Sequence, residues 1–322
     1  MDYTTRHLAR SEDVTVAPRG ALLVEIRWRC RTEIDEERIR ISMRNFRARL
    51  LIEVAFVFGF ALLFDQSAVA SGSGGGQPGL HVEEGVSVRD IQVAGNETQR
   101  LLFYGPTVDS RGVLIMFPGG TGEVGIARDG SVRHGENFVV RTRGLWARRG
   151  YEVVVVDALG QKSMRGIRSS SWYADVTRKI VAYVHSLSGA NVWIMGTSQG
   201  SIAAMLAAST ARPGIVSGVV LTEPVSVLGH SKETVFDAHP ENVEIPALIV
   251  ANRNDECWVA PPDHAEDIAK AMSRAATTVL FIDGGTSASA NPCSSLAPHG
   301  YWGMDERVVE RIDRWMRETR GT

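Results

Sequence analysis

The stretch that decides the fold is Asn191-Val-Trp-Ile-Met-Gly-Thr-Ser-Gln-Gly-Ser-Ile-Ala-Ala-Met-Leu-Ala-Ala208. Its apolar start predicts a buried strand, and its run of small helix-forming residues predicts a helix. Between them, Gly196-Thr197-Ser198-Gln199-Gly200 has the G-x-S-x-G spacing of a sharp strand-to-helix turn that exposes a serine hydroxyl. Such a turn strains the serine backbone, and the two glycines leave room for neighbouring backbone.

Ser198 is therefore a candidate nucleophile. A serine hydroxyl reacts poorly until a base takes its proton, and that base is usually a histidine oriented by a carboxylate. The helix after Ser198 would point its N-terminus at the site, so the unpaired N–H of Gln199 is a candidate donor to a developing oxyanion.

Composition excludes several classes of function. The 322 residues are 44% hydrophobic and 22% charged, which fits a soluble globular protein of one or two domains. A net charge of −2 gives no electrostatic reason to expect nucleic acid or an anionic membrane as partner. No metal-ligand spacing and no dinucleotide or phosphate-loop motif is present, so we expect neither metal nor cofactor.

Residues 43–70 have the pattern of a signal peptide inside the chain. Three arginines precede an apolar run, Leu50 to Phe64, and Ala68-Val69-Ala70 resembles a cleavage site. The run has about 15 residues, fewer than the roughly 20 that span a membrane. We therefore expect a secreted or periplasmic protein, the alternative being one anchored by an uncleaved segment. No membrane partner is expected after cleavage.

The expected signal peptide determines how the residues before and after it are interpreted. Residues 1–42 would be an extension from a misassigned start, or else a cytoplasmic tail on an anchored protein. Residues 71–84 begin with a Gly/Ser-rich tract and are expected to be a flexible linker.

From residue 85 to 322, expected strands alternate with expected helices, and no second linker appears, which predicts a single α/β domain. The expected strands are 86–93, 101–104, 113–117, 152–156, 192–195, 218–221, 247–251 and 278–282, and the expected helices include 137–149, 170–186 and 305–317. The apolar strands lack polar alternation, as in a sheet covered on both faces.

From about Gly112 to Met316 the chain resembles the α/β-hydrolase superfamily, in the order of its motifs as well as its elements. The resemblance implies an α/β fold with a mostly parallel sheet of about eight strands flanked by helices. Few residues separate the strands expected at 218–221 and 247–251, so any cap over the site would be small or absent.

The family order of serine, acid and histidine points to two further residues. Asp255 follows the expected strand 247–251 and precedes Pro261-Pro262 and a helix, which matches the family position of the acid. The lesser candidates for the acid are Glu256, Asp263 and Glu223. The alternative is that Asp255 is an ordinary turn residue, since aspartate is common in loops.

His299 occupies the family position of the base, after the last strand and before the closing helix. Most other histidines are expected to be surface or cap residues, and His264 is at an expected helix start. Three of them lie in loops that could line the site: His134, His230 and His239.

The second oxyanion donor should come from Pro118-Gly119-Gly120-Thr121-Gly122, which is similar to the family's H-G-G segment with Pro118 in place of histidine. Gly120 is the preferred donor by position and Thr121 the next, because glycines let the backbone approach the substrate. The alternative is a plain glycine-rich turn.

Cleavage after Ala70 would leave two cysteines, and in an oxidising compartment we expect Cys257 to pair with Cys293. Because Cys257 follows Asp255 closely and Cys293 precedes His299, the bridge would tie the acid loop to the base loop. The alternative is two separate buried thiols.

Together these residues predict an exported serine hydrolase that cleaves a small-molecule carboxylic ester through an acyl-enzyme. Serine at the turn argues against the family's dehalogenase, epoxide-hydrolase and dienelactone-hydrolase patterns. Trp172 and Trp258 are possible lining residues. The alternatives are a peptidase or acyltransferase with the same triad, or a non-catalytic binding module on the same fold. The sequence does not indicate the oligomeric state.

Overall fold

A computed structural model describes residues 85–212 and 214–319. The expected extension (1–42), signal peptide (43–70) and linker (71–84) lie outside these residues. Among the described helices, none combines the length and apolarity needed to cross a membrane.

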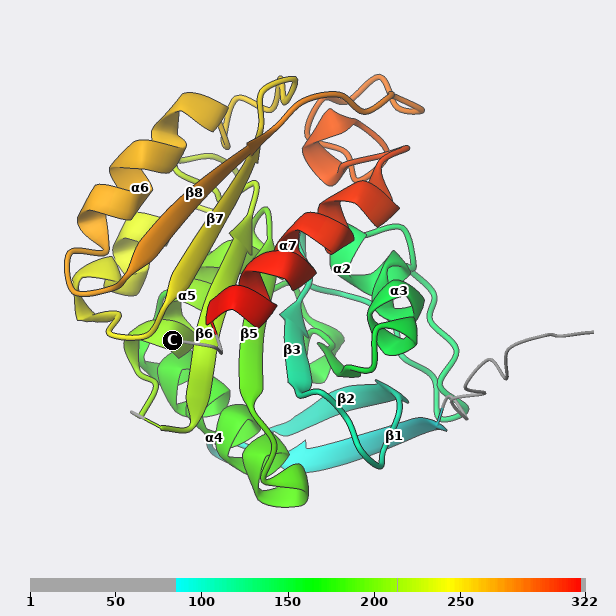
Figure 1. Cartoon of the computed structure of the whole chain (residues 1–322). Helices are drawn as coiled ribbons and strands as arrows, with labels where there is room; N and C mark the ends of the chain where they lie inside the picture. The colour runs from blue at the N-terminus through cyan, green and yellow to red at the C-terminus, as the bar shows by residue number, and fades with distance from the viewer. Residues whose placement is uncertain (1–84, 213, 320–322) are drawn as a thin grey trace, which may run out of the picture. The chain divides into compact units, whose positions relative to one another are not determined.

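The described chain forms one eight-stranded sheet flanked by helices (Figure 1). The strands are β1 (Gly85–Gln92), β2 (Thr98–Gly105), β3 (Val113–Phe117), β4 (Glu152–Val156), β5 (Val192–Thr197), β6 (Val216–Thr222), β7 (Ala247–Asn252) and β8 (Thr277–Ile282). The helices are α2 (Phe138–Arg141), α3 (Arg143–Arg148), α4 (Ser171–Ser188), α5 (Gly200–Ser209), α6 (Ala265–Ala271) and α7 (Asp305–Thr319).

The sheet order is β1-β2-β4-β3-β5-β6-β7-β8. Strand β2 is antiparallel to both of its neighbours, β1 and β4, and all the other neighbouring pairs are parallel. Single 3-10 turns cover 159–161, 235–238, 240–242, 262–264 and 298–300. The expected sheet of about eight strands is confirmed. The connection from β6 to β7 holds only two such turns and no α-helix.

Successive side chains of each strand enter two different cores, because they point to opposite faces of the sheet. One core joins the sheet to α4, α5 and α6, and the other joins it to α2, α3 and α7. Strands such as β3, with the sequence VLIMF, are buried along their whole length because helices cover both faces.

The expected single helix over 137–149 is wrong in one respect. It is two short helices, α2 and α3, divided at Thr142. The buried Thr142 hydroxyl donates to the Phe138 carbonyl at 2.7 Å, a local bond that competes with regular helix. The division still lets Phe138 and Trp146 pack into the same core.

Register brings the carboxyl ends of the parallel strands level with one another. Gly196 near the end of β5 lies opposite Phe117 of β3 and Leu221 of β6, and Asn252 of β7 lies opposite Ile282 of β8. Loops that follow these strands therefore meet at one edge of the sheet, where open α/β sheets bind their ligands.

Candidate active site

Ser198 lies in the turn between β5 and α5 with a φ of 52°, in the left-handed region that non-glycine residues rarely adopt. Close packing of the backbone leaves no room for a side chain at Gly196 or Gly200. A Cβ on Gly196 would lie 2.3 Å from the Gly200 carbonyl oxygen, and a Cβ on Gly200 would lie 2.1 Å from that of Phe117. Glycine at both flanking positions therefore allows the strained turn that holds Ser198.

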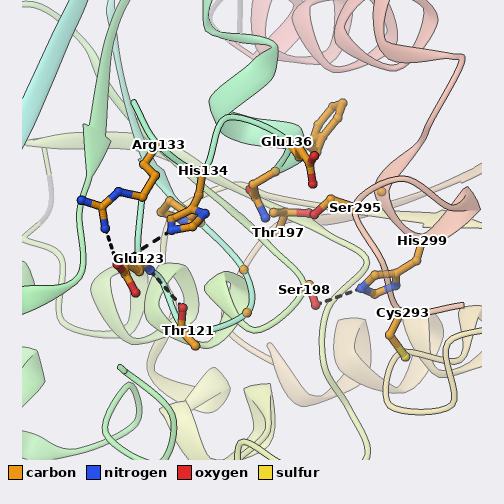
Figure 2. A pocket seen from close by; sticks show the side chains of 16 residues that line it. Thr121, Glu123, Arg133, His134, Glu136, Thr197, Ser198, Cys293, Ser295 and His299 are labelled. Carbon is orange, nitrogen blue, oxygen red and sulfur yellow. Dashed lines mark hydrogen bonds and ion pairs between the residues drawn. The ribbon is translucent and has the colours of Figure 1, made fainter. Parts of the chain in front are cut away.

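Ser198, His299 and Asp255 form a continuous hydrogen-bond path. Ser198 Oγ lies 2.9 Å from His299 Nε2, and His299 Nδ1 lies 2.7 Å from Asp255 Oδ2 (Figure 2 shows the Ser198–His299 contact). Since a carboxylate only accepts, Nδ1 carries the proton, and Nε2 accepts from the serine hydroxyl. The structure brings together the three residues that the sequence predicted.

Asp255 is held by a second bond, since its Oδ1 accepts from the Cys257 N–H at 2.8 Å. Glu223, the lesser acid candidate at the end of β6, lies beside it but makes a different contact, accepting from the Asn252 N–H at 2.8 Å. Burial, and next the charge of Asp255, raise the pKa of Glu223 well above its usual value. Burial and the neighbouring carboxyl group of Asp255 therefore favour the protonated form of Glu223.

The raised pKa of Glu223 gives a stability prediction. An unfolded glutamate loses its proton near its ordinary pKa of 4.5 while the folded one keeps it, so Glu223 stabilises the fold most at low pH. That contribution falls as pH rises from 4.5 towards the folded pKa, by at most about 1.4 kcal/mol per pH unit. Since glutamine does not titrate, the melting temperature of Glu223→Gln relative to wild type should rise between pH 5 and pH 9. A difference that stays constant with pH would contradict this.

The candidate oxyanion donors are the backbone N–H groups of Gln199, Gly120 and Thr121. None of the three donates a hydrogen bond within the described residues. Gly120 has a φ of 58°, and the Gly122 N–H closes the loop onto the Gly119 carbonyl at 3.0 Å. The loop therefore presents free N–H groups next to Ser198, and Gly120 and Thr121 both line the same cavity as Ser198.

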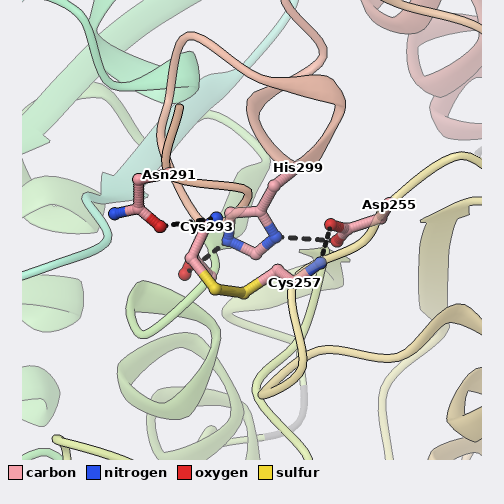
Figure 3. Close-up of a disulfide and its surroundings, with 6 residues drawn as sticks. Asp255, Cys257, Asn291, Cys293 and His299 are labelled. Atoms are coloured by element: carbon pink, nitrogen blue, oxygen red, sulfur yellow. Dashed lines mark hydrogen bonds and ion pairs between the residues drawn. A yellow bond between two sulfur atoms is a disulfide. The ribbon is translucent and has the colours of Figure 1, made fainter. Parts of the chain in front are cut away.

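The expected disulfide between Cys257 and Cys293 is confirmed, with 36 residues of sequence separation. Figure 3 shows it beside the Asp255–His299 contact, joining the loop of the acid to the loop of the base. The Cys293 N–H donates to the Asn291 side chain at 3.0 Å. The disulfide thus joins the loop of Asp255 covalently to the loop of His299.

Removing the disulfide should lower both stability and activity. In the chain-entropy account, a loop of this length stabilises by about 3–4 kcal/mol. We expect the Cys257→Ser, Cys293→Ser double variant to lose that much in urea unfolding and to lose kcat as the two loops loosen. Reductant should reproduce both losses in wild type and leave the double variant unchanged. Full activity of the double variant would contradict the proposed role of the bridge.

Three comparisons bear on this geometry. No family model and no curated protein matches the sequence. Among solved structures, Est1E from Butyrivibrio proteoclasticus matches at a TM-score of 0.53 with 16% identity, over 73% of this chain and 100% of the other. The esterase Pf2001 from Pyrococcus furiosus matches at 0.50 with 13% identity, over 76% and 97%. This chain has the α/β-hydrolase fold.

The same α/β-hydrolase fold also occurs in a protein that is named for a different activity. Dipeptidyl peptidase 4 from Porphyromonas gingivalis matches at a TM-score of 0.51 with 12% identity, over 73% of this chain and 35% of that one. Since one fold hosts several chemistries, the choice among them rests on the site.

Two cavities of the α/β-hydrolase domain open at Ser198. One of about 410 Å³ is lined by Ser198, His299 and mostly polar residues, among them Glu123, Arg133, His134, Glu136 and Asn137 (Figure 2). The other, of about 230 Å³, shares Gly120, Ser198 and Cys293 with the first and is also lined by Arg165, Gln199, His230 and Trp258. Ser198 therefore lines both cavities.

The remaining sequence candidates are separated from the triad. Glu256 and Asp263 are exposed, His239 faces Glu241, and His264 Nδ1 lies 3.0 Å from the Ser226 hydroxyl. His134 and His230 line the cavities but make no contact with Ser198. Of the two tryptophans, Trp258 lines the smaller cavity, whereas Trp172 lines neither.

Within the described residues, one group of three side chains has metal-ligand proximity: Glu223, Asp255 and His299, whose ligand atoms lie within 4.8 Å of one another. Both ring nitrogens of His299 are already engaged, by Asp255 and by Ser198. We therefore read this group as an acid–base arrangement and assign it no metal.

Sequence analysis missed the residues that hold the His299 loop. Arg141 of α2 forms a two-point ion pair with Asp305, at 2.7 and 2.9 Å, and donates to the carbonyls of Ser295 and Gly300. Asn252 donates to the carbonyls of Gly284 and Pro298 at 2.9 and 3.0 Å. These bonds fix the backbone on either side of His299, and no motif in the sequence marks them.

Proposed function

We propose that this chain is a serine hydrolase that cleaves small, polar carboxylic esters through an acyl-enzyme intermediate. The observation that carries the proposal is the path from Ser198 Oγ through His299 to Asp255, at 2.9 and 2.7 Å, beside unengaged backbone N–H groups. A nucleophile, a base, an orienting carboxylate and oxyanion donors are the parts that acyl transfer needs.

In the proposed reaction, Ser198 Oγ attacks the ester carbonyl while His299 Nε2 takes the hydroxyl proton. The tetrahedral oxyanion accepts hydrogen bonds from Gln199 N–H and from Gly120 or Thr121 N–H. His299 then returns the proton to the leaving alcohol, which leaves an acyl group on Ser198. Water then attacks the acyl carbonyl while His299 takes a proton from it, and His299 returns that proton to Ser198 Oγ as the acid leaves. Asp255 stays ionised and stabilises the imidazolium.

The cavities support the substrate class. Glu123, Arg133 and Glu136 along the larger cavity are charged, and an alkyl chain laid against them would displace their hydration without gaining apolar contact. The connection between β6 and β7 forms no helical cap that could cover a long chain. A short acyl group and a polar alcohol fit these walls best.

A series of p-nitrophenyl esters tests the proposal. We expect kcat/KM to fall by about tenfold or more from acetate to decanoate, because the polar walls cannot bury added methylenes. A preference for decanoate would contradict the substrate class. Rapid cleavage of aminoacyl p-nitroanilides with no ester hydrolysis would favour the peptidase, and transfer to added alcohol in preference to water would favour the acyltransferase. The absence of all three reactions, together with no labelling of Ser198 by a fluorophosphonate probe, would favour a non-catalytic binding module.

We also propose that the protein is exported. The Cys257–Cys293 disulfide supports this, because such bonds persist in oxidising compartments. The pattern at 43–70 is consistent with it and lies outside the described residues. Mass spectrometry of the native N-terminus tests the proposal. A start near Ser71 is expected, and a mature protein that retains Met1 to Ser42 would contradict cleavage.

A further inference from the structure

The loop that carries the candidate oxyanion donors is packed between Ser198 and a buried arginine. On one side, a Cβ on Gly119 would lie 3.0 Å from Ser198 Cβ. On the other side, a Cβ on Gly122 would lie 2.9 Å from Arg168 Nη2. The glycines thus let this loop sit in direct contact with both the nucleophile and the guanidinium.

Arg168 holds the loop by its carbonyl groups. Its Nη2 donates to the Gly120 carbonyl at 3.0 Å and lies 3.4 Å from that of Pro118. The Gly120 carbonyl and the Thr121 N–H belong to one trans peptide, and no described peptide bond is cis. Because that unit is planar, fixing the direction of the Gly120 carbonyl fixes the opposite direction of the Thr121 N–H.

Glu233 in turn holds the segment that bears Arg168. Its carboxylate accepts from the backbone N–H groups of Gly166, Arg168 and Ser169 and from the Ser169 hydroxyl, at 2.9 to 3.2 Å. Glu233 is itself buried and belongs to the connection between β6 and β7. A carboxylate with four donors fixes this backbone, and with it the origin of the arginine side chain.

Burying the Arg168 guanidinium costs more free energy than a side chain that only fills space would. Arg168 is 2% exposed, and its Nη1 has no hydrogen-bond partner. Burial lowers the pKa of Arg168 to about 10, which still leaves the guanidinium charged at neutral pH. Burying a charge this way is unfavourable unless its interactions are needed, and an apolar side chain of similar volume would cost less.

We propose that Arg168 is a positioning residue of the oxyanion hole: it clamps the Gly120–Thr121 peptide so that the loop's N–H groups stay aimed at the carbonyl attacked by Ser198, and Glu233 anchors the clamp. The inference deepens the proposed function and rests on it. It assigns to Arg168 an effect on the transition state through the loop, without contact to the substrate.

Steady-state kinetics with Arg168→Met tests the clamp, because methionine fills much of the volume but cannot donate. Losing one oxyanion donor typically lowers kcat by 10²–10³-fold, so a misdirected one should lower it by about 10–100-fold. KM should change by less than about threefold, since the ground-state ester does not depend on these donors. Arg168→Lys should recover part of kcat as it restores one charged donor.

A boronic acid that forms a tetrahedral adduct with serine provides the readout that a purely structural role would not move. Its inhibition constant should weaken by the same factor as kcat falls. The matched control is Arg100→Met, because Arg100 also donates to a backbone carbonyl, that of Ile126 at 3.1 Å, but lines neither cavity. We expect Arg100→Met to lower melting temperature while leaving kcat and the inhibition constant within about twofold.

The outcomes separate the inference from the proposed function. A folded Arg168→Met with kcat within twofold of wild type, or with lower kcat but unchanged boronic-acid inhibition, overturns the clamp and leaves the function standing. If Arg168→Met does not fold, the clamp requires that Arg168→Lys and Glu233→Gln each lower kcat by more than twofold and weaken boronic-acid inhibition in proportion, and wild-type values in both variants overturn it. A wild type that neither hydrolyses esters nor binds the boronic acid overturns both.

Discussion

Replacing Ser198 by alanine is expected to lower kcat for ester hydrolysis by about 10⁴–10⁶-fold. The hydroxyl is the atom that would attack, and the Ser198–His299 contact at 2.9 Å gives its proton a direct acceptor. Water bound next to His299 could still react slowly, so a small residual rate remains. The measurement is kcat on p-nitrophenyl acetate with wild-type and Ser198→Ala protein.

Ser209→Ala is the matched control for this loss. Ser209 lies at the other end of α5, where its hydroxyl donates to the Leu206 carbonyl at 3.0 Å, so its removal leaves the site intact. Because residues of a triad act as a unit, Ser198→Ala combined with His299→Ala should be no slower than Ser198→Ala alone. An Ser198→Ala variant that keeps more than about a tenth of wild-type kcat would exclude Ser198 as nucleophile.

Asp255→Asn is expected to lower kcat by about 10⁴-fold with little change in stability. The carboxylate accepts the Nδ1 proton of His299 at 2.7 Å, which leaves Nε2 free to accept from Ser198. Asparagine can donate its amide to Nδ1, which would place the proton on Nε2 and prevent it from acting as base. The measurement is kcat against pH for both proteins, with the exposed Asp263→Asn as control.

Glu223 is the residue that could rescue Asp255→Asn, and the structure argues against it. Its carboxylate accepts from the Asn252 N–H and makes no bond to His299, and burial raises its pKa, which favours the protonated form. If it nevertheless served as the acid, Asp255→Asn alone would lose little and the double variant with Glu223→Gln would lose much. That pattern would transfer the role of the acid to Glu223.

Local sequence rules accounted for the strands of the sheet and for the turn that carries Ser198. The strands were predictable because their apolar runs are unbroken, and Ser198 was predictable because its turn admits only glycine at two neighbouring positions. Asp255 and His299 were predicted from the resemblance to the α/β-hydrolase superfamily, which implies an acid and then a base after later strands. The disulfide was predicted because cleavage after Ala70 would leave two cysteines in an oxidising compartment.

The supporting charges could not be predicted, because they depend on contacts between distant segments. Arg168 and Glu233 lie in polar stretches that look like exposed loops, yet both are buried, Arg168 against the loop of Gly120 and Glu233 against residues 166–169. Arg141 sits in an expected helix and gives no sign that it reaches the His299 loop. The break at Thr142 lies where the threonine hydroxyl and its own N–H both bond the Phe138 carbonyl, a contact that the helical pattern of the sequence does not reveal.

The most direct test of the account is to incubate wild-type protein with a fluorophosphonate probe and locate the modified residue by peptide mass spectrometry. Activated serine hydrolases form a stable phosphonyl adduct because the probe mimics the tetrahedral intermediate. We expect one adduct, on Ser198, whose formation stops in His299→Ala and proceeds in Ser209→Ala. No adduct on the folded wild-type protein, or an adduct on a different serine, would contradict the claim that Ser198, His299 and Asp255 form a working catalytic centre.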